Sequence, residues 1–258
     1  MKAHIVLAHP EPKSFNGQLS GISQRVLSAA GWQVTLSDLY AMDFDPREGP
    51  HHYRSRKNPD VFDVLGEQRF NAENRTTPPD AEAEIRRLLD SDLLVVHFPI
   101  WWFGAPAILK GWIDRVLVHG RLHRSTMRYD TGVCSGKTMI ACATTGAGEE
   151  TCSPSGKEGD TRLHLWPLLY SFRYVGFDVY EPEVLHGVAG AAFTEGHEGG
   201  TSRMDAHARR WTDVLETLSS RPLVRYNRDQ DFDETERLVP GAPVYSPFIR
   251  HAPDDVPQ

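Results

Sequence analysis

The sequence has few cysteines and no excess of basic residues. Its 258 residues include 3 cysteines, and 35 acidic side chains outnumber 28 basic ones, which gives a formal net charge of -7. Three cysteines without a C-x-x-C pair do not build a disulfide framework, so we expect a reducing, cytoplasmic compartment. Nucleic acid is disfavoured as a partner, because phosphate-binding surfaces need clustered lysine and arginine.

Long apolar runs and two common nucleotide-binding motifs are also missing. The apolar run near the N-terminus, residues 5–8, is too short for a signal-peptide core or a membrane span, so we expect no membrane insertion. The patterns G-x-G-x-x-G and G-x-x-x-x-G-K-[ST] do not occur. Their absence disfavours a Rossmann nicotinamide domain and a P-loop.

Short apolar runs alternate with helical patterns along the chain. This alternation is typical of an α/β fold in which helices cover both faces of a parallel sheet. The runs that predict strands lie at residues 4–9, 32–39, 92–99, 137–146 and 177–185. The helical patterns lie at residues 19–30, 78–90, 105–118, 161–175 and 211–218.

Two segments do not follow the alternation. Residues 46–79 are polar without a clear period, and a connection of that length is usually functional or interfacial. Residues 221–258 hold six of the 18 prolines and show no helical period. We therefore expect a catalytic domain over residues 1–220 and an extended tail over residues 221–258 that packs on the body or on a partner subunit.

Three loops after predicted strands suggest a ligand site, because ligands of such sheets bind beyond the carboxyl ends of the strands. Residues 9–16 precede a helix N-terminus, which favours an anion such as a pyrophosphate. Residues 98–106 include three consecutive aromatics, which cannot all point inward. Residues 143–148 are small and let backbone amides approach a flat ring. Together these features suit a flavin.

At these loops the sequence becomes recognisable. The run from Phe98 to Val116 closely resembles the NAD(P)H:quinone oxidoreductases of the DT-diaphorase type, which are flavodoxin-like flavoproteins. The resemblance covers residues 3–219 and implies a five-stranded parallel sheet of order 2-1-3-4-5. It also implies a homodimer that works as an FAD-dependent two-electron reductase. NAD(P)H would pass hydride to flavin N5, and a quinone or quinoid substrate would then take it, by ping-pong.

The resemblance also implies which residues bind the cofactor. The loop after the first strand contains one hydroxyl side chain, accompanied by His9. This small number of hydroxyl groups favours FAD over FMN. The residues that match the family's pyrophosphate-binding positions are His9, Ser14, Phe15, Asn16 and Gln18. The residues that match its positions around the flavin ring are Pro99, Ile100, Trp101, Trp102, Phe103, Thr144, Thr145, Gly146 and Ala147.

The sequence departs from the family pattern nearest the chemistry. Cys152 and Glu158 stand where the family has a tyrosine and a histidine that stabilise charge on the reduced flavin. A carboxylate 4 Å from an anionic flavin costs about 4 kcal/mol in a partly dry site. Glu158 therefore turns away, is protonated, or is offset by Lys157, and we interpret it as a proton donor or a bystander. His123 and Ser125 replace two substrate-side tyrosines, which favours a larger or more polar quinone.

Other interpretations carry less weight. His119 and His123 have a zinc-like spacing but no third ligand nearby in sequence, and His51 and His52 suit a solvated loop, so no metal is expected. Alternative functions are an azo or nitro reductase of the same fold, an electron carrier and a regulatory flavoprotein.

Overall fold

The computed structural model describes residues 1–188 and 198–252, and these contain one parallel sheet. Its order is β2-β1-β3-β4-β5, with β6 pairing beside β5 on β4, which confirms the flavodoxin-like α/β prediction. Each pairing between two of its strands is parallel. The strands are β1 (Lys2–Leu7), β2 (Gln33–Asp38), β3 (Leu93–Pro99), β4 (Thr138–Thr145), β5 (Asp178–Val179) and β6 (Glu183–His186).

The prediction of one continuous strand over residues 177–185 was wrong. The chain leaves the sheet between β5 and β6, where Pro182 has no amide hydrogen and restricts the backbone of Glu181. The Glu181 amide donates to the Pro222 carbonyl at 2.9 Å instead of to a strand.

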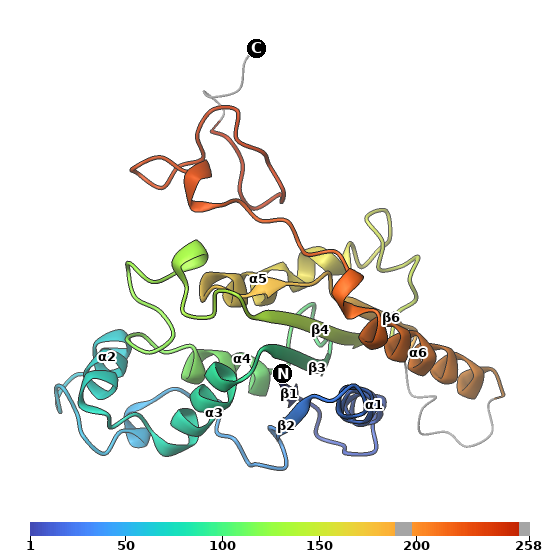
Figure 1. Cartoon of the computed structure of the whole chain (residues 1–258), viewed down its shortest axis with the longest axis horizontal. Coiled ribbons are helices and arrows are strands. Elements are labelled where there is room, and N and C mark those ends of the chain that lie inside the picture. Colours follow the sequence, from blue (N-terminus) through green and yellow to red (C-terminus); the bar gives the residue numbers. More distant parts are fainter. Residues whose placement is uncertain (189–197, 253–258) are drawn as a thin grey trace.

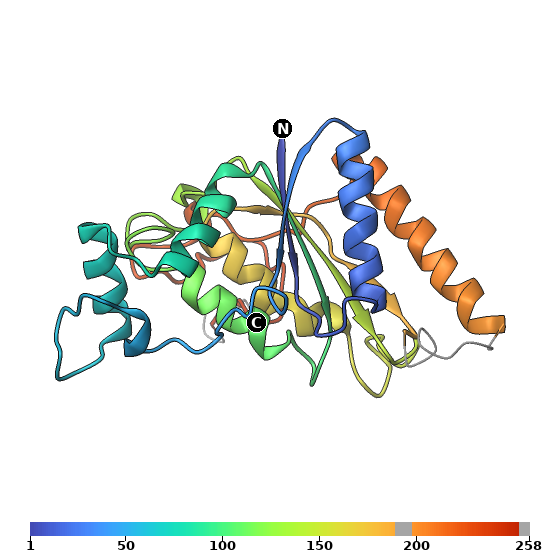
Figure 2. The ribbon, with the colours of Figure 1, turned by 90° about the horizontal axis from the view of Figure 1, so that it is seen from below.

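Helices cover both faces of the sheet, as Figure 2 shows. One face carries α1 (Phe15–Ala29) and α6 (Glu198–Glu216), over a core that includes Ile5 and Trp211. The opposite face carries α3 (Pro79–Asp90), α4 (Ala107–Val116) and α5 (Thr161–Tyr174), over a core that includes Phe98 and Trp112. All of β3 is buried between the two layers, because it is the central strand.

The polar segment 46–79 contains a helix that its sequence pattern does not predict, α2 (Val64–Asn74), after the short 3-10 turn η1 (Pro50–His52). The packed face of α2 is polar. Its Glu67 is 1% exposed and accepts from Arg56 Nε at 3.0 Å, whereas its Leu65 is 57% exposed. A helix that buries polar residues and exposes apolar ones lacks the usual hydrophobic period.

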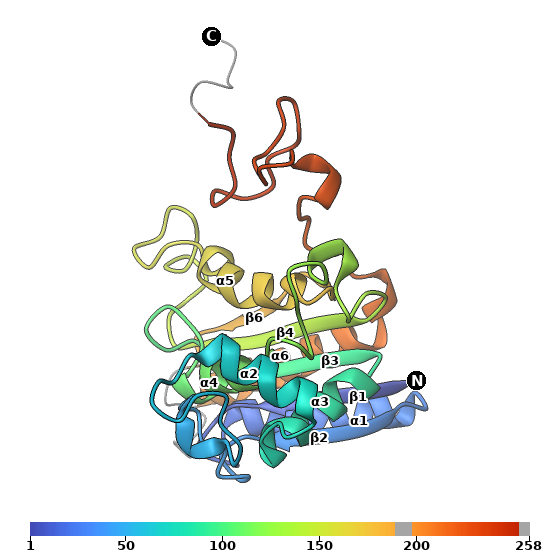
Figure 3. The same cartoon turned by 90° about the vertical axis from the view of Figure 1, so that its left-hand side faces the viewer.

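The tail leaves the body after the turn η3 (Leu218–Ser220) and extends beyond α5 in Figures 1 and 3. Asp130 connects it to the body, because this carboxylate accepts from Arg173 of α5 and, at 2.7 Å, from the backbone amide of Asp229 in the tail. The Phe248 ring also stacks on Trp166 at 4.6 Å. Residues 253–258 of the predicted tail lie outside the described residues.

In residues 1–188 and 198–252, no helix is both long and apolar enough to cross a lipid bilayer.

Candidate functional site

The loops after β1, β3 and β4 meet at one edge of the sheet. The Asn16 side-chain amide donates to Thr144 Oγ1 at 2.8 Å and joins the first loop to the third. The Ile100 amide donates to the Thr144 carbonyl at 2.7 Å and joins the second loop to the third. The rings of His9 and Trp101 lie 6.2 Å apart, between the first and second loops. The three loops therefore form one surface at the carboxyl edge.

The N-terminus of α1 presents backbone amides at this edge. Ser14 is the N-cap, and its hydroxyl accepts from the Gly17 amide at 3.1 Å. The amides of Phe15 and Asn16 have no intrahelical partner, and they lie at the positive end of the helix dipole, which favours anions. Asn16 is buried, and its Oδ1 has no partner among the described residues. Gln18 is exposed and donates to the Lys13 carbonyl at 3.3 Å.

His9 faces this site as a neutral donor. Burial lowers its pKa and outweighs the opposing hydrogen bond and charge of Glu11. Its Nδ1 accepts from the Glu11 amide at 3.0 Å, so the proton of the neutral ring is on Nε2. That N–H can donate to a phosphate oxygen.

The three consecutive aromatics form a tight turn with an unusual backbone. Trp101 and Gly104 exchange two backbone hydrogen bonds of 3.0 and 3.1 Å, which leaves Trp102 and Phe103 as the central residues. Their φ angles of 50° and 63° are left-handed, a region that costs a non-glycine residue about 1–2 kcal/mol. Trp102 is 95% exposed and Phe103 is 54% exposed. Strain that displays aromatic rings is typical of a ligand site. Nearby, Pro99 is buried and Ile100 is partly buried.

Replacing Trp102 by glycine tests whether this turn stores strain for binding. Glycine adopts the left-handed region without a steric penalty, so Trp102→Gly is expected to raise the free energy of unfolding of the ligand-free protein by about 1 kcal/mol. Flavin affinity is expected to fall about fivefold, because an aromatic contact is worth about 1 kcal/mol. Urea unfolding and flavin fluorescence titration measure the two effects. A variant with lower stability and unchanged flavin affinity would contradict both expectations.

The loop after β4 offers backbone groups at the same edge. Thr144 and Thr145 are buried, Gly146 is exposed and Ala147 is partly buried. The Ala147 amide lies 3.4 Å from Thr145 Oγ1, and its carbonyl accepts from the Gly187 amide at 2.9 Å. The loop is thus held in place by the residue that follows β6, while the backbone of Gly146 faces solvent.

Cys152 and Glu158 lie together beside this loop. Cys152 is 4% exposed, and its Sγ lies 3.8 Å from Glu158 Oε2. Burial, and then the charge of Glu158, raise the pKa of the thiol, so it is a weak hydrogen-bond donor at neutral pH and not a nucleophile. Glu158 and Lys157 are both exposed.

His123 occupies a different place. Its ring contacts Tyr174 at 5.4 Å and His119 at 5.2 Å, and burial, followed by the charge of His119, lowers its pKa. It lines a cavity of about 540 Å³ bounded by residues of α2, α4 and α5. Within the described residues of one chain, no contact joins His123 to Cys152 or Glu158.

His164 belongs to the site, although the sequence pattern does not single it out. It lies in the first turn of α5, and its ring meets the Phe103 ring edge-on at 5.1 Å. The buried residues Thr161 and Leu168 lie three before it and four after it, so helical spacing could have indicated its inward side.

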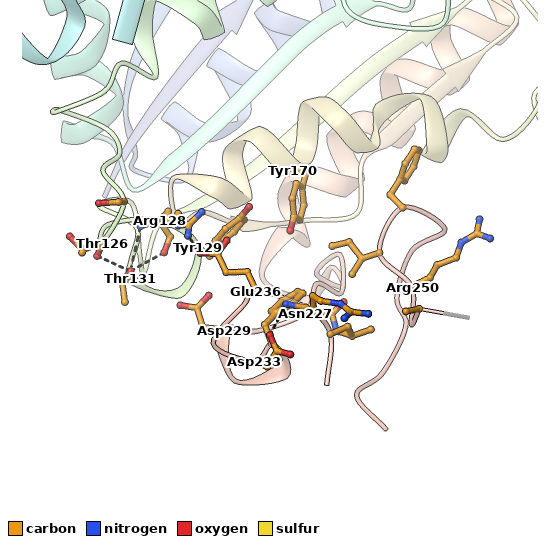
Figure 4. Close-up of a pocket in the computed structure, with 17 residues that line it drawn as sticks. Thr126, Arg128, Tyr129, Thr131, Tyr170, Asn227, Asp229, Asp233, Glu236 and Arg250 are labelled. Carbon is orange, nitrogen blue, oxygen red and sulfur yellow. Dashed lines mark hydrogen bonds and ion pairs between the residues drawn. The ribbon is translucent and has the colours of Figure 1, made fainter. Parts of the chain in front are cut away.

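A second cavity, of about 670 Å³, lies between the tail and the body (Figure 4). Tyr129 and Tyr170 line it from the body, and Asn227, Asp233 and Glu236 line it from the tail. It is therefore separate from the edge formed by the three loops.

Residues 1–210 match a family model described as a flavodoxin-like fold. The ribosyldihydronicotinamide dehydrogenase [quinone] of Mus musculus is 40% identical over 189 residues, which are 72% of this chain and 82% of that protein. The chain belongs to the flavodoxin-like quinone reductase family.

Other relatives show the same membership. NAD(P)H dehydrogenase [quinone] 1 of Rattus norvegicus is 35% identical over 219 residues, 84% of this chain and 77% of that one. A solved structure of a provisionally assigned quinone reductase from Klebsiella pneumoniae has a TM-score of 0.83 and 29% identity, and the match covers 93% of this chain and 94% of that one. Within the quinone reductase family, then, the similarity extends over nearly the whole chain.

Proposed function

We propose that this protein is an FAD-dependent two-electron reductase that passes hydride from NAD(P)H to a quinone or quinoid substrate by ping-pong. The observation that carries the proposal is the convergence of a helix N-terminus, an exposed aromatic turn and a loop of backbone amides at one sheet edge. The names of the curated relatives support the same reaction class.

The residues of this edge suit a flavin. His9 Nε2–H and the first-turn amides of α1 would hold phosphate oxygens, and the unpartnered Asn16 Oδ1 would accept a hydrogen bond from the cofactor. The strained turn at Trp102 and Phe103 would pack against the ring. When bound, the flavin supplies the reversible uptake and release of a hydride equivalent. We favour FAD over FMN, because Ser14 is the only hydroxyl in the loop after β1.

A homodimer would explain where His123 acts. Val64 and Leu65 line the cavity that His123 also lines, and Leu65 is 57% exposed in the single chain. Burying such residues against a second copy would bring the region of His123 and Ser125 toward the partner's flavin edge. Sedimentation at micromolar concentration tests this, and a monomer that retains full activity would exclude it.

The reaction itself is tested by steady-state kinetics. Purified protein is assayed with NADH, NADPH and ribosyldihydronicotinamide as donors and with menadione as acceptor, because the relatives' names include more than one donor. Parallel double-reciprocal lines with at least one donor are expected for a ping-pong reductase. Failure of all three donors to bleach the bound flavin would overturn the proposal. An azo dye and a nitroaromatic compound serve as comparison acceptors.

Replacing Glu158 by glutamine separates a proton donor from a bystander. If Glu158 delivers a proton, the rate of the oxidative half-reaction is expected to fall by about a hundredfold or more in Glu158→Gln and to lose its pH dependence between pH 5 and 9. Stopped-flow absorbance measures both half-reactions. Unchanged rates across that range would leave Glu158 without a role in proton transfer, and Ser155→Ala, an exposed change in the same loop, is the control.

A further inference from the structure

The segment between β2 and α2 contains a cluster of metal-ligand type that the flavin site does not use. Asp45, His51 and His52 each offer one ligand atom, and these atoms all lie within 4.8 Å of one another. His51 Nε2 lies 3.1 Å from Asp45 Oδ2, and His52 Nε2 lies 3.7 Å from the same oxygen. We propose that Asp45, His51 and His52 form a binding site for one Zn²⁺ ion.

The spacing suits zinc without a rearrangement of the backbone. Zinc ligands lie about 2.0–2.1 Å from the metal, so two ligand atoms of a tetrahedral site are about 3.3 Å apart. The two separations from Asp45 Oδ2 fall on either side of that value. Two imidazoles and one carboxylate are a zinc ligand set, and with three protein ligands the fourth position is left to water.

The backbone at Asp45 is held firmly against helix α4. Arg115 of α4 is 2% exposed and donates to the Asp45 carbonyl at 2.8 Å, and its guanidinium lies 4.9 Å from the Phe44 ring centre. The next residue, Pro46, packs so closely on Gly111 of α4 that a Cβ there would lie 2.2 Å from the Pro46 carbonyl oxygen. The carboxylate is thus presented from a fixed backbone.

The His51 ring is directed toward Asp45, whereas His52 Nε2 donates to the Arg47 carbonyl at 2.8 Å, a hydrogen bond that a bound metal would replace. A Cβ at Gly49 would lie 2.9 Å from His51 Nδ1, so glycine leaves room for this ring to fold back. His52 is mostly buried, with 11% of its side chain exposed, and the two imidazole rings lie 3.9 Å apart. The rings therefore occupy one small volume beside the carboxylate and are not spread over the surface.

One cation already contacts this carboxylate, and it leaves room for a metal. Arg47 donates to Asp45 Oδ1 through Nε at 3.0 Å and to Oδ2 through Nη2 at 3.0 Å. The Arg47 side chain is 79% exposed, so its Nη2 can move aside while Oδ1 keeps the Nε bond and the Arg47 amide bond of 3.0 Å. Such hydrogen bonds to the other carboxylate oxygen orient metal ligands.

Zinc at this position would connect Asp45, in the segment that follows β2, to His51 and His52 of η1. The exposed basic residues Arg54 and Lys57 follow closely and are tryptic sites. Binding of Zn²⁺ is therefore expected to slow tryptic cleavage of residues 53–63, because the metal holds the start of this segment to α4.

Calorimetric titration of tag-free, EDTA-treated holoprotein with Zn²⁺ tests the proposal. One equivalent is expected to bind, with affinity reduced more than about tenfold in His51→Ala and in His52→Ala and lost in the double variant. His251→Ala, a tail histidine, is the matched control and should bind like the parent. Mg²⁺ should not bind, because it prefers oxygen ligands.

A spectroscopic readout identifies the ligands independently. Cu²⁺ binds the same donor types, and its electron paramagnetic resonance spectrum should show coupling to two nitrogens in the parent and to one in each single variant. Circular dichroism and thermal unfolding establish that the variants are folded. Unchanged zinc affinity in the double variant, or an unchanged copper spectrum, would overturn the proposal.

Discussion

A Gly17→Ala protein is expected to be purified with little or no flavin. Gly17 lies in the first turn of α1, and a Cβ at this position would lie 2.1 Å from the backbone oxygen of Pro12. No side-chain rotation relieves a clash with backbone, so the loop of residues 9–14 must move away from the helix. That movement separates His9 from the free amides that are proposed to bind the pyrophosphate.

The loss should be large. If two charge-assisted hydrogen bonds of about 1.5 kcal/mol each are broken, flavin affinity falls about a hundredfold. The free energy of unfolding should also fall by about 1–3 kcal/mol, as in other overpacked sites. Fluorescence titration of the ligand-free protein with FAD gives the affinity, and urea unfolding gives the stability.

Gly21→Ala in the same helix is the matched control. A Cβ there would lie 3.5 Å from Arg25 Nη1, an ordinary contact with a flexible side chain. Alanine is the better helix former, so this variant should gain about 0.5–1 kcal/mol and bind FAD normally. Equal FAD affinity in the Gly17 and Gly21 variants would place the cofactor away from this helix terminus.

The second large effect is a loss of stability in acid that originates at His97 of β3. This ring is fully buried, and its Nε2 lies 2.9 Å from Ser23 Oγ, which also accepts from Trp211 Nε1 at 2.9 Å. Burial lowers the pKa of His97 from 6.5 to about 3. The folded protein therefore keeps this imidazole neutral at a pH where the unfolded chain has protonated it.

The sign of the pH effect follows from that difference. Above about pH 6.5 the ring is neutral in both states and contributes no pH dependence. Between pH 6.5 and 3 the unfolded chain binds one more proton, so the free energy of unfolding falls by about 1.4 kcal/mol per pH unit. The contribution of His97 to the slope ends near pH 3, where the folded state also takes up the proton.

A comparison with His97→Gln isolates this contribution. Glutamine keeps a polar group near Ser23 but does not titrate, so its unfolding free energy should decline less steeply in acid by about 1.4 kcal/mol per pH unit. Urea unfolding of both ligand-free proteins at pH 7, 6, 5 and 4 gives the two curves. Parallel curves would mean that another group causes the acid sensitivity.

The sheet could be predicted from the sequence because its strands carry strong local signals. The runs at 92–99 and 137–146 are continuous and apolar, as expected of central parallel strands, and they correspond to β3 and β4. The last strand and helix α2 were not predicted correctly, and both errors have local causes. Pro182 divides the last strand, and α2 buries Glu67 and exposes Leu65, the reverse of the pattern that identifies a helix.

The sequence predicts which loops form the site, but it does not predict how the individual side chains lie within it. Parallel strands place their carboxyl ends at one edge, so residues 9–16, 98–106 and 143–148 had to be neighbours. The left-handed backbone at Trp102 could not be predicted, because neither central residue of that turn is the usual glycine or asparagine. The contact of His164 with Phe103 depends on how α5 packs, which a single sequence does not specify.

The most direct test of the flavin edge and its chemistry is an anaerobic titration of the purified yellow protein. Mass spectrometry first identifies the released cofactor, which should be FAD at one per chain. Added NADH or NADPH should bleach the flavin absorbance, and one equivalent of menadione should then restore it. A colourless protein that does not bind FAD, or a bound flavin that no nicotinamide donor bleaches, would contradict the proposed reductase.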